Sequence, residues 1–189
     1  MQIGLYFGSF NPVHHGHLII ASHIAGHTNL DQIWFIVSPQ NPFKVSHSLL
    51  NEYQRLHLVH LAIEGELNLK ASDIEFHLPK PSYTIDTLTY LEEKYPQHHF
   101  AVIMGSDSFQ NLHKWKNADV LMKRYFFFVY NRAGFEASPL QPENVTILDA
   151  PLLQISATHI RELAKQGKSI RYLVPDAVKE EIEKNRYYK

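Results

Sequence analysis

The chain has 189 residues, of which 44% are hydrophobic and 20% are charged, as in an ordinary globular protein. Lysine and arginine total 18 against 19 acidic residues, a balance that excludes an overall field attracting nucleic acid or an anionic membrane. The absence of cysteine excludes disulfides, thiolate nucleophiles and cysteine-ligated metals. No segment approaches the ~20 apolar residues that span a bilayer, and no basic segment precedes an apolar one at the amino terminus, so we expect a cytoplasmic protein.

Short apolar runs alternate with amphipathic segments along the chain. The apolar runs predict buried strands at 3–7, 32–38, 99–104 and 125–130, with weaker candidates at 69–76 and 145–148. Helical spacing of apolar residues predicts helices at 15–27, 53–63 and 84–95, the last capped by Thr84. Two further helices are expected at about 157–166 and 175–185.

Strands that alternate with helices predict an α/β fold: a Rossmann-like, doubly wound, mainly parallel sheet with helices on both faces. Ligands of such folds bind beyond the carboxyl ends of the strands, where the strand order reverses. The loops at 8–16, 39–50, 79–83 and 105–116 are therefore the candidates for a site. No repeat or linker divides the chain, so we expect a single domain, 1–189, with a small helical portion at about 156–189.

The first of these loops reads GSFNPVHHGH at 8–17 and leads from the first strand into the first helix. Gly8 and Pro12 indicate a tight, stiff turn, and Gly16 leaves room for a ligand at the helix start. The free amides and partial positive charge of a helix amino end suit phosphate. His14 and His17 lie three residues apart, so both imidazoles can donate hydrogen bonds to that phosphate.

The residues of this turn also allow two other interpretations. It can be a Gly/Pro turn with surface histidines, or a transition-metal site, although HxxH supplies only two ligands. The chain contains neither GxxxxGK[ST] nor GxGxxG, so it lacks the other common phosphate-binding loops.

A second candidate phosphate-binding segment reads ISATHIRE at 155–162. Ser156 is a suitable N-cap, and Thr158 offers a further hydroxyl. Arg161, one turn later, can reach the same phosphate with its planar guanidinium. By itself the segment is equally compatible with an ordinary capped amphipathic helix.

Together these motifs resemble those of the HxGH nucleotidyltransferase superfamily. The turn at 8–17 resembles its GxFxPxHxGH signature, and 155–161 resembles its ISSTxIR element, which holds the triphosphate of ATP. Ala157 replaces the second serine of that element and removes one hydroxyl contact. The segments PSYTIDTL at 81–88, MGSDSF at 104–109 and PQNPFK at 39–44 resemble those of bacterial nicotinate-nucleotide adenylyltransferases, and the similarity extends from residue 3 to about 178.

The resemblance implies an enzyme of NAD biosynthesis that transfers the adenylyl group of ATP to nicotinate mononucleotide and releases pyrophosphate. It implies Mg²⁺ as the cofactor, held mainly by the ATP phosphates, because no acidic cluster is visible in the sequence. ATP and nicotinate mononucleotide are the expected partners, without nucleic acid or membrane. A homo-oligomer is compatible with the sequence.

The resemblance also assigns roles to individual residues. The expected catalytic residues are His14, His17, Lys44 and Arg161. The expected ATP-binding residues are Gly8, Ser9, Phe10, His14, Gly16, His17, Gly105, Asp107, Ser156, Thr158 and Arg161. The expected acceptor-binding residues are Lys44, Ser82, Tyr83, Thr84, Asp107 and Trp115. Three of these have ordinary alternatives: Asp107 can cap a helix, Trp115 can belong to the core, and Lys44 can be a solvated charge.

Two other functions fit parts of the pattern. Phosphopantetheine adenylyltransferase is the nearest rival, but its acceptor has no aromatic ring for Trp115 to face. A non-catalytic sensor of adenine nucleotides needs no apparatus for transfer at the α-phosphate, so the combination of His14, His17, Lys44 and Arg161 argues against it.

Overall fold

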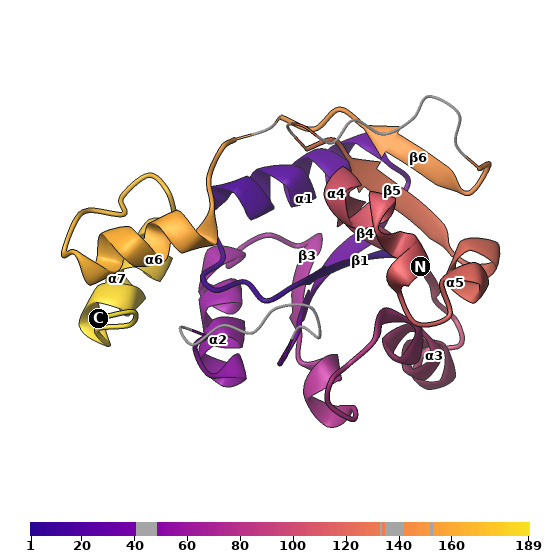
Figure 1. The fold of residues 1–189 in the computed structure, drawn as a ribbon, viewed down its shortest axis with the longest axis horizontal. Helices are drawn as coiled ribbons and strands as arrows, with labels where there is room; N and C mark the ends of the chain where they lie inside the picture. The colour runs from indigo at the N-terminus through magenta and orange to yellow at the C-terminus, as the bar shows by residue number, and fades with distance from the viewer. Residues whose placement is uncertain (41–48, 133, 135–141, 152) are drawn as a thin grey trace.

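A computed structural model describes residues 1–40, 49–132, 134, 142–151 and 153–189. In these residues six parallel strands form a sheet with the order β3-β2-β1-β4-β5-β6 (Figure 1). The strands are β1 (Gln2–Gly8), β2 (Gln32–Val37), β3 (Leu69–Ser72), β4 (His99–Gly105), β5 (Phe126–Tyr130) and β6 (Val145–Leu148). The chain is therefore doubly wound, and the strand order reverses between β1 and β4. The predicted Rossmann-like α/β fold is confirmed.

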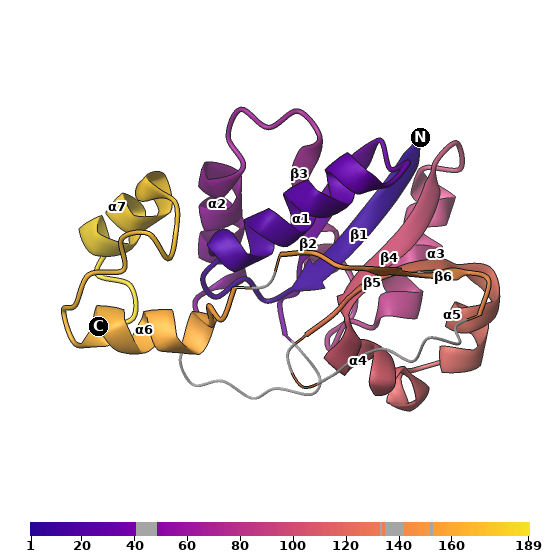
Figure 2. The same ribbon diagram turned by 90° about the horizontal axis from the view of Figure 1, so that it is seen from above.

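Helices cover both faces of this sheet (Figure 2). The α-helices are α1 (His15–His27), α2 (Glu52–Ala62), α3 (Thr84–Lys94), α4 (Ser106–Gln110), α5 (Ala118–Arg124), α6 (Ala157–Lys165) and α7 (Asp176–Lys184), and the 3-10 helices are η1 (Ile74–His77) and η2 (Leu112–Lys114). One hydrophobic cluster joins the sheet to α1, α2, α6 and α7, and a second joins it to α3 and α5.

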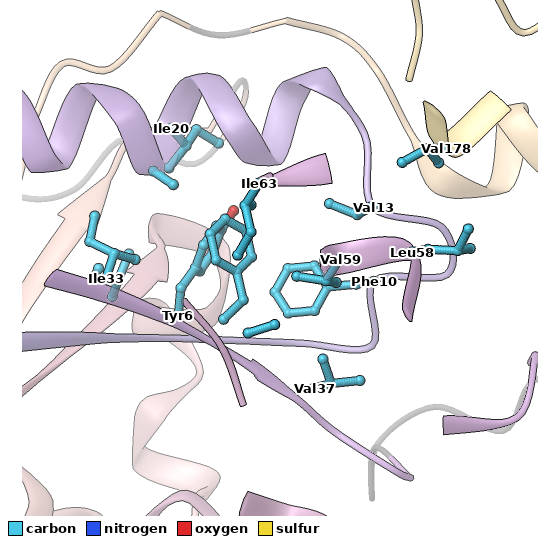
Figure 3. Packing of buried hydrophobic residues seen from close by; sticks show 14 of the residues in the cluster. Tyr6, Phe10, Val13, Ile20, Ile33, Val37, Leu58, Val59, Ile63 and Val178 are labelled. Atoms are coloured by element: carbon cyan, nitrogen blue, oxygen red, sulfur yellow. The ribbon is translucent and has the colours of Figure 1, made fainter. Parts of the chain in front are cut away.

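Alternation along the strands separates the two clusters. In β2, Ile33 and Phe35 belong to the first cluster, while Trp34 and Ile36 belong to the second. This is the period of two that a strand buried on both faces requires. Figure 3 shows the first cluster, in which Phe10 and its neighbours pack beneath α1. The turn at 8–17, which carries the candidate histidines, is thus continuous with the hydrophobic core.

Three details differ from the expectations drawn from sequence. The strand at 69–76 ends at Ser72, because the Ser72 hydroxyl and the Asp73 carbonyl accept the amides of Ile74 and Phe76 and turn the chain into η1. The predicted cap at Thr84 is wrong: the N-cap position of α3 is residue 83, without a side-chain cap. The short helices α4 and α5 were not predicted.

Arg55 in α2 connects the loops that follow β1 and β2. Its side chain is 0% exposed, and burial lowers its pKa. The guanidinium donates to the carbonyl oxygens of Ser9 at 2.6 Å, Ser38 at 2.8 Å, Pro39 at 3.1 Å and Leu50 at 2.9 Å. The planar guanidinium of Arg55 therefore holds together two loops that leave the carboxyl edge of the sheet.

Candidate active site

The centre of the candidate site is the point where the strand order reverses. β1 ends at Gly8 and β4 ends at Gly105, and the two strands pair along their length. The loops leaving parallel neighbours diverge here, which opens a crevice at the carboxyl edge of the sheet. The loop after β1 carries the histidine turn, and the loop after β4 carries Asp107.

The histidine turn places two stacked imidazoles at the start of α1. The ring centroids of His14 and His17 are 3.7 Å apart, with 25° between their planes. A Cβ added to Gly16 would lie 3.0 Å from the His14 ring, and one added to Gly8 would lie 2.8 Å from the ring of Phe10. Gly8 therefore serves packing instead of backbone freedom, since the positive φ of the turn, 45°, is at Phe10. Gly16 therefore leaves room first for the His14 ring, and it lines the same cavity as that ring.

The tautomer of His17 follows from its contact with the turn. The amide of His14 donates to Nδ1 of His17 at 3.3 Å. Because Nδ1 accepts, the neutral ring carries its proton on Nε2, which is left to donate to a ligand. In His14, the ring nitrogen Nδ1 is buried and has no hydrogen-bond partner among the residues that the structure describes.

Both imidazoles are neutral near pH 7. Burial, together with electrostatic repulsion from Arg132 and His15, lowers the pKa of His14 to about 4. Burial also holds the pKa of His17 well below its ordinary value, and His14 and Arg132 act in the same direction. Two neutral rings can bind an oxyanion through N–H donors without adding charge to the site.

We expect the protein to lose stability as the pH falls from about 6.5 to about 4. In this window His14 is protonated in the unfolded chain but not in the folded one, whose pKa is about 4. The unfolded state therefore binds more protons, and the effect of His14 is on the order of 3 kcal/mol. His17 acts in the same direction.

Urea unfolding near pH 7 and pH 4.5 measures this effect. His14→Asn should lose less stability between the two pH values than the wild type does. The matched control is His113→Asn, at an exposed residue outside the site, and it should behave like the wild type. Equal losses in the wild type and His14→Asn would contradict the pKa assignment.

The segment that begins at Ser156 reaches the histidine turn from the other end of the chain. The Ser156 hydroxyl accepts the amide of His159 at 3.2 Å, which confirms the predicted N-cap of α6. Arg161 donates to the carbonyl of Asn11 at 2.8 Å and to the Thr158 hydroxyl at 3.2 Å. α6 is thereby attached to the turn at 8–17.

A cavity of about 340 Å³ lies beside the start of α1. Its polar lining comes from separate segments of the chain: His14, His17, Asp107, Arg132, Gln154 and Ser156. Residues predicted to bind ATP from three distant motifs thus border one space. Neutral imidazoles, a serine cap and a guanidinium are the groups expected around a polyphosphate.

A second cavity, of about 160 Å³, contains the predicted acceptor residues of two other motifs. Ser82, Tyr83 and Thr84 line it at the start of α3, and Trp115 lines it with a half-buried ring. The amides of Tyr83 and Thr84 have no acceptor among the described residues, and no side chain caps the helix. These amides are donors available to an anion. Tyr130 lines both cavities, so the two spaces are adjacent.

The sequence matches a known family over most of its length. Residues 5–163 match the family model described as cytidylyltransferase-like. A Cytophaga hutchinsonii protein named "Probable nicotinate-nucleotide adenylyltransferase" is 53% identical over 100% of this chain and 98% of its own length. A Flavobacterium johnsoniae protein of the same name is 49% identical over the whole of both chains.

The chain belongs to the nicotinate-nucleotide adenylyltransferase family. Among solved structures, Plasmodium falciparum nicotinic acid mononucleotide adenylyltransferase complexed with NaAD has a TM-score of 0.83 at 20% identity, covering 99% of this chain and 97% of that one. The same protein complexed with APC has a TM-score of 0.81. At this identity the structures show a shared fold, which is the predicted nucleotidyltransferase fold.

Some predicted residues of this family member are not placed in either cavity. Lys44 lies outside the described residues. Phe10 is 2% exposed and packs on Tyr6 and Phe35, so its side chain supports the turn from within the core. The Thr158 hydroxyl accepts a hydrogen bond from Arg161.

Three residues near the site were not predicted from sequence. Arg132 lines the larger cavity and pairs with Asp107 at 3.4 Å. Glu75 lines the smaller cavity. The hydroxyl of Tyr188 donates to Oδ1 of Asn11 in the histidine turn at 2.9 Å. None of them belongs to a local motif, and only the fold brings them to the site.

The residues that the structure describes contain no group of three or more His, Asp or Glu side chains able to hold a metal ion. The Asp107 carboxylate at the larger cavity is paired with Arg132. Within the part of the chain that the structure describes, no helix is long and apolar enough to cross a membrane.

Proposed function

We propose that this protein transfers the adenylyl group of ATP to nicotinate mononucleotide, with ATP in the larger cavity and the acceptor in the smaller one. The observation that carries the proposal is the adjacency of the two cavities at Tyr130, beside the stacked histidines. Two nucleotides bound there would meet at the start of α1. The family relationship supports the same reaction.

In this reaction an oxygen of the acceptor phosphate attacks the α-phosphorus of ATP, and the bond to the bridging oxygen of the β-phosphate breaks. Pyrophosphate leaves with that electron pair. The attacking phosphate is already an anion near pH 7, so no general base is needed. The protein instead aligns two mutually repelling anions and stabilises the charge that develops.

Each polar group then has a defined role. His14 would bind the α-phosphate region, and the Nε2–H of His17 would donate to the oxygen on which charge grows. Lys44 and Arg161 would neutralise phosphate oxygens. Arg132 is a further cation at the same cavity, and its charge lowers the pKa of both histidines.

We propose that Mg²⁺ enters as part of the MgATP substrate. A site with one paired carboxylate suits an ion that is held mainly by phosphate oxygens and water. Bound in this way, the ion screens the charge of the leaving pyrophosphate. The alignment of the two nucleotides remains the task of the side chains.

Pyrophosphate release from MgATP tests the proposal. We expect release only when nicotinate mononucleotide is present. Release with phosphopantetheine instead would indicate the rival transferase, and ATP binding without release with either acceptor would indicate a nucleotide sensor. Zn²⁺ retained through dialysis without ATP turnover would favour the metal-site interpretation of His14 and His17.

We expect Trp115→Ala to weaken acceptor binding selectively. If the indole stacks on the pyridine ring, its removal should cost ~1–3 kcal/mol, the scale of base–aromatic stacking. The KM for nicotinate mononucleotide should rise accordingly, while the KM for ATP changes little. Steady-state kinetics with each substrate varied in turn measures both constants.

The control for this prediction is Leu112→Ala. Leu112 is 4% exposed in the same loop and lines neither cavity, so its truncation loosens the loop without removing a stacking face. A similar loss for both substrates in Trp115→Ala, as a collapsed loop would give, would favour the core interpretation of Trp115.

A further inference from the structure

Glu75 is a buried carboxylate at the wall of the smaller cavity. It is 2% exposed and lies in η1, which precedes α3 in the chain. No lysine, arginine or histidine nitrogen in the described residues lies within ion-pair distance of it. Burying a carboxylate without a cation is costly unless hydrogen bonds compensate.

Two hydroxyl groups provide that compensation. The Ser82 hydroxyl donates to Oε2 of Glu75 at 2.7 Å, and the Thr87 hydroxyl donates to Oε1 at 2.9 Å. Ser82 is 7% exposed and Thr87 is 0% exposed, so both bonds are shielded from water. Hydrogen bonds to an ionised acceptor are the strong ones, and here each carboxylate oxygen receives one.

The two donors lie on either side of the start of α3. Ser82 precedes the helix, Thr87 is in its first turn, and Tyr83 and Thr84 lie between them. A single carboxylate that holds both points restrains the main chain of the four residues between them. Two of these, Tyr83 and Thr84, line the cavity, and their amides have no acceptor among the described residues.

The carboxylate also decides which donors face the cavity. An ionised carboxylate only accepts hydrogen bonds, so the hydroxyl hydrogen of Ser82 is directed at Glu75. Ser82 can then present only oxygen lone pairs to an occupant. The donors that remain at this wall are the amides of Tyr83 and Thr84.

We propose that Glu75 is a positioning residue for the acceptor: its carboxylate clamps Ser82 and Thr87 and thereby sets the Tyr83 and Thr84 amides to receive an anionic substituent of the acceptor ring. This inference rests on the proposed function, which places nicotinate mononucleotide in the smaller cavity. Glu75 itself does not contact the reacting atoms. Its effect should therefore appear in acceptor affinity and not in the binding of ATP.

The test compares Glu75→Gln and Glu75→Met in steady-state kinetics and in thermal unfolding. Methionine fills similar space but leaves the Ser82 hydroxyl without its acceptor and the Thr87 hydroxyl with only the Tyr83 carbonyl, at 3.3 Å. We expect the KM for nicotinate mononucleotide to rise at least ~10-fold. Glutamine can still hydrogen-bond to both hydroxyls, although these bonds are weaker because its amide carries no charge. We therefore expect the KM for nicotinate mononucleotide to rise no more than ~3-fold. In both variants the KM for ATP should stay within about twofold of the wild type.

The control is Asn144→Ala. The Asn144 side-chain amide donates two hydrogen bonds, to the carbonyls of Met122 at 2.6 Å and Tyr125 at 2.7 Å, and lines neither cavity. Its removal should lower the melting temperature without a selective change in the acceptor KM. If Glu75→Met does not fold, Ser82→Ala and Thr87→Val each remove one donor and should each raise the acceptor KM.

The outcomes separate this inference from the proposed function. A wild type that does not adenylylate nicotinate mononucleotide would overturn both. A wild type that does so, with folded Glu75 variants that keep its acceptor KM, would overturn only the role of Glu75. Equal rises in the KM for ATP and for the acceptor would likewise identify Glu75 as a structural residue alone.

Discussion

His17→Ala should lower kcat by ~100- to 1000-fold, the usual cost of removing one donor to a developing oxyanion. The Nδ1 atom of His17 accepts the His14 amide, so Nε2–H points away from the turn with its proton in place. A donor whose bond strengthens as charge builds on the α-phosphate changes kcat more than affinity. ATP should therefore still bind within roughly threefold of wild type.

Rapid-quench or steady-state assays with both substrates saturating measure the change, and equilibrium titration measures ATP affinity. His15→Ala is the matched control, because His15 lies in the same turn of α1 but lines neither cavity. It should keep most of the activity. His14→Ala should also raise the KM for ATP, in keeping with a binding role.

A His17→Ala protein that folds normally and keeps more than a tenth of wild-type kcat would refute this mechanism. The histidine turn would then be a phosphate-binding loop only, and the interpretation as a nucleotide sensor would gain support. Circular dichroism of the variant guards against a folding defect. This control matters because the His17 ring packs on the rings of Tyr6 and Phe10, with centroid separations of 6.2 and 5.1 Å.

The fold could be predicted from sequence because its signals are local. Buried strands such as β1 and β4 are continuous apolar runs, and α1 begins and ends where its pattern predicts. α4 and α5 have 5 and 7 residues, too few for a helical pattern to be recognised. The end of β3 depends on the bonds of Ser72 and Asp73 to the following turn, which composition alone does not reveal.

The site could be predicted only as far as its motifs reach. His14, Ser156, Tyr83 and Trp115 belong to recognisable segments, and each lines one of the two cavities. Arg132 acts through contacts with other segments, as Arg55, Glu75 and Tyr188 do. Such residues have no pattern of their own in a single sequence, because their partners lie up to 177 positions away.

The second large effect concerns the choice between acceptors. We expect kcat/KM for nicotinate mononucleotide to exceed that for nicotinamide mononucleotide by at least ~100-fold. A pyridine carboxylate can accept hydrogen bonds from both the Tyr83 and the Thr84 amides at the uncapped start of α3. The carboxamide offers one oxygen and an NH₂ group, and that NH₂ group would face a donor.

The discrimination therefore rests on the amides of α3 and not on Ser82. The hydrogen of the Ser82 hydroxyl is directed at Glu75, so this hydroxyl does not donate to the carboxylate. A carboxamide would leave one of the two amides without an acceptor. Parallel assays at saturating MgATP measure the ratio. Comparable kcat/KM values for the two acceptors would show that the amides of α3 do not read the ring substituent, while adenylyl transfer itself would stand.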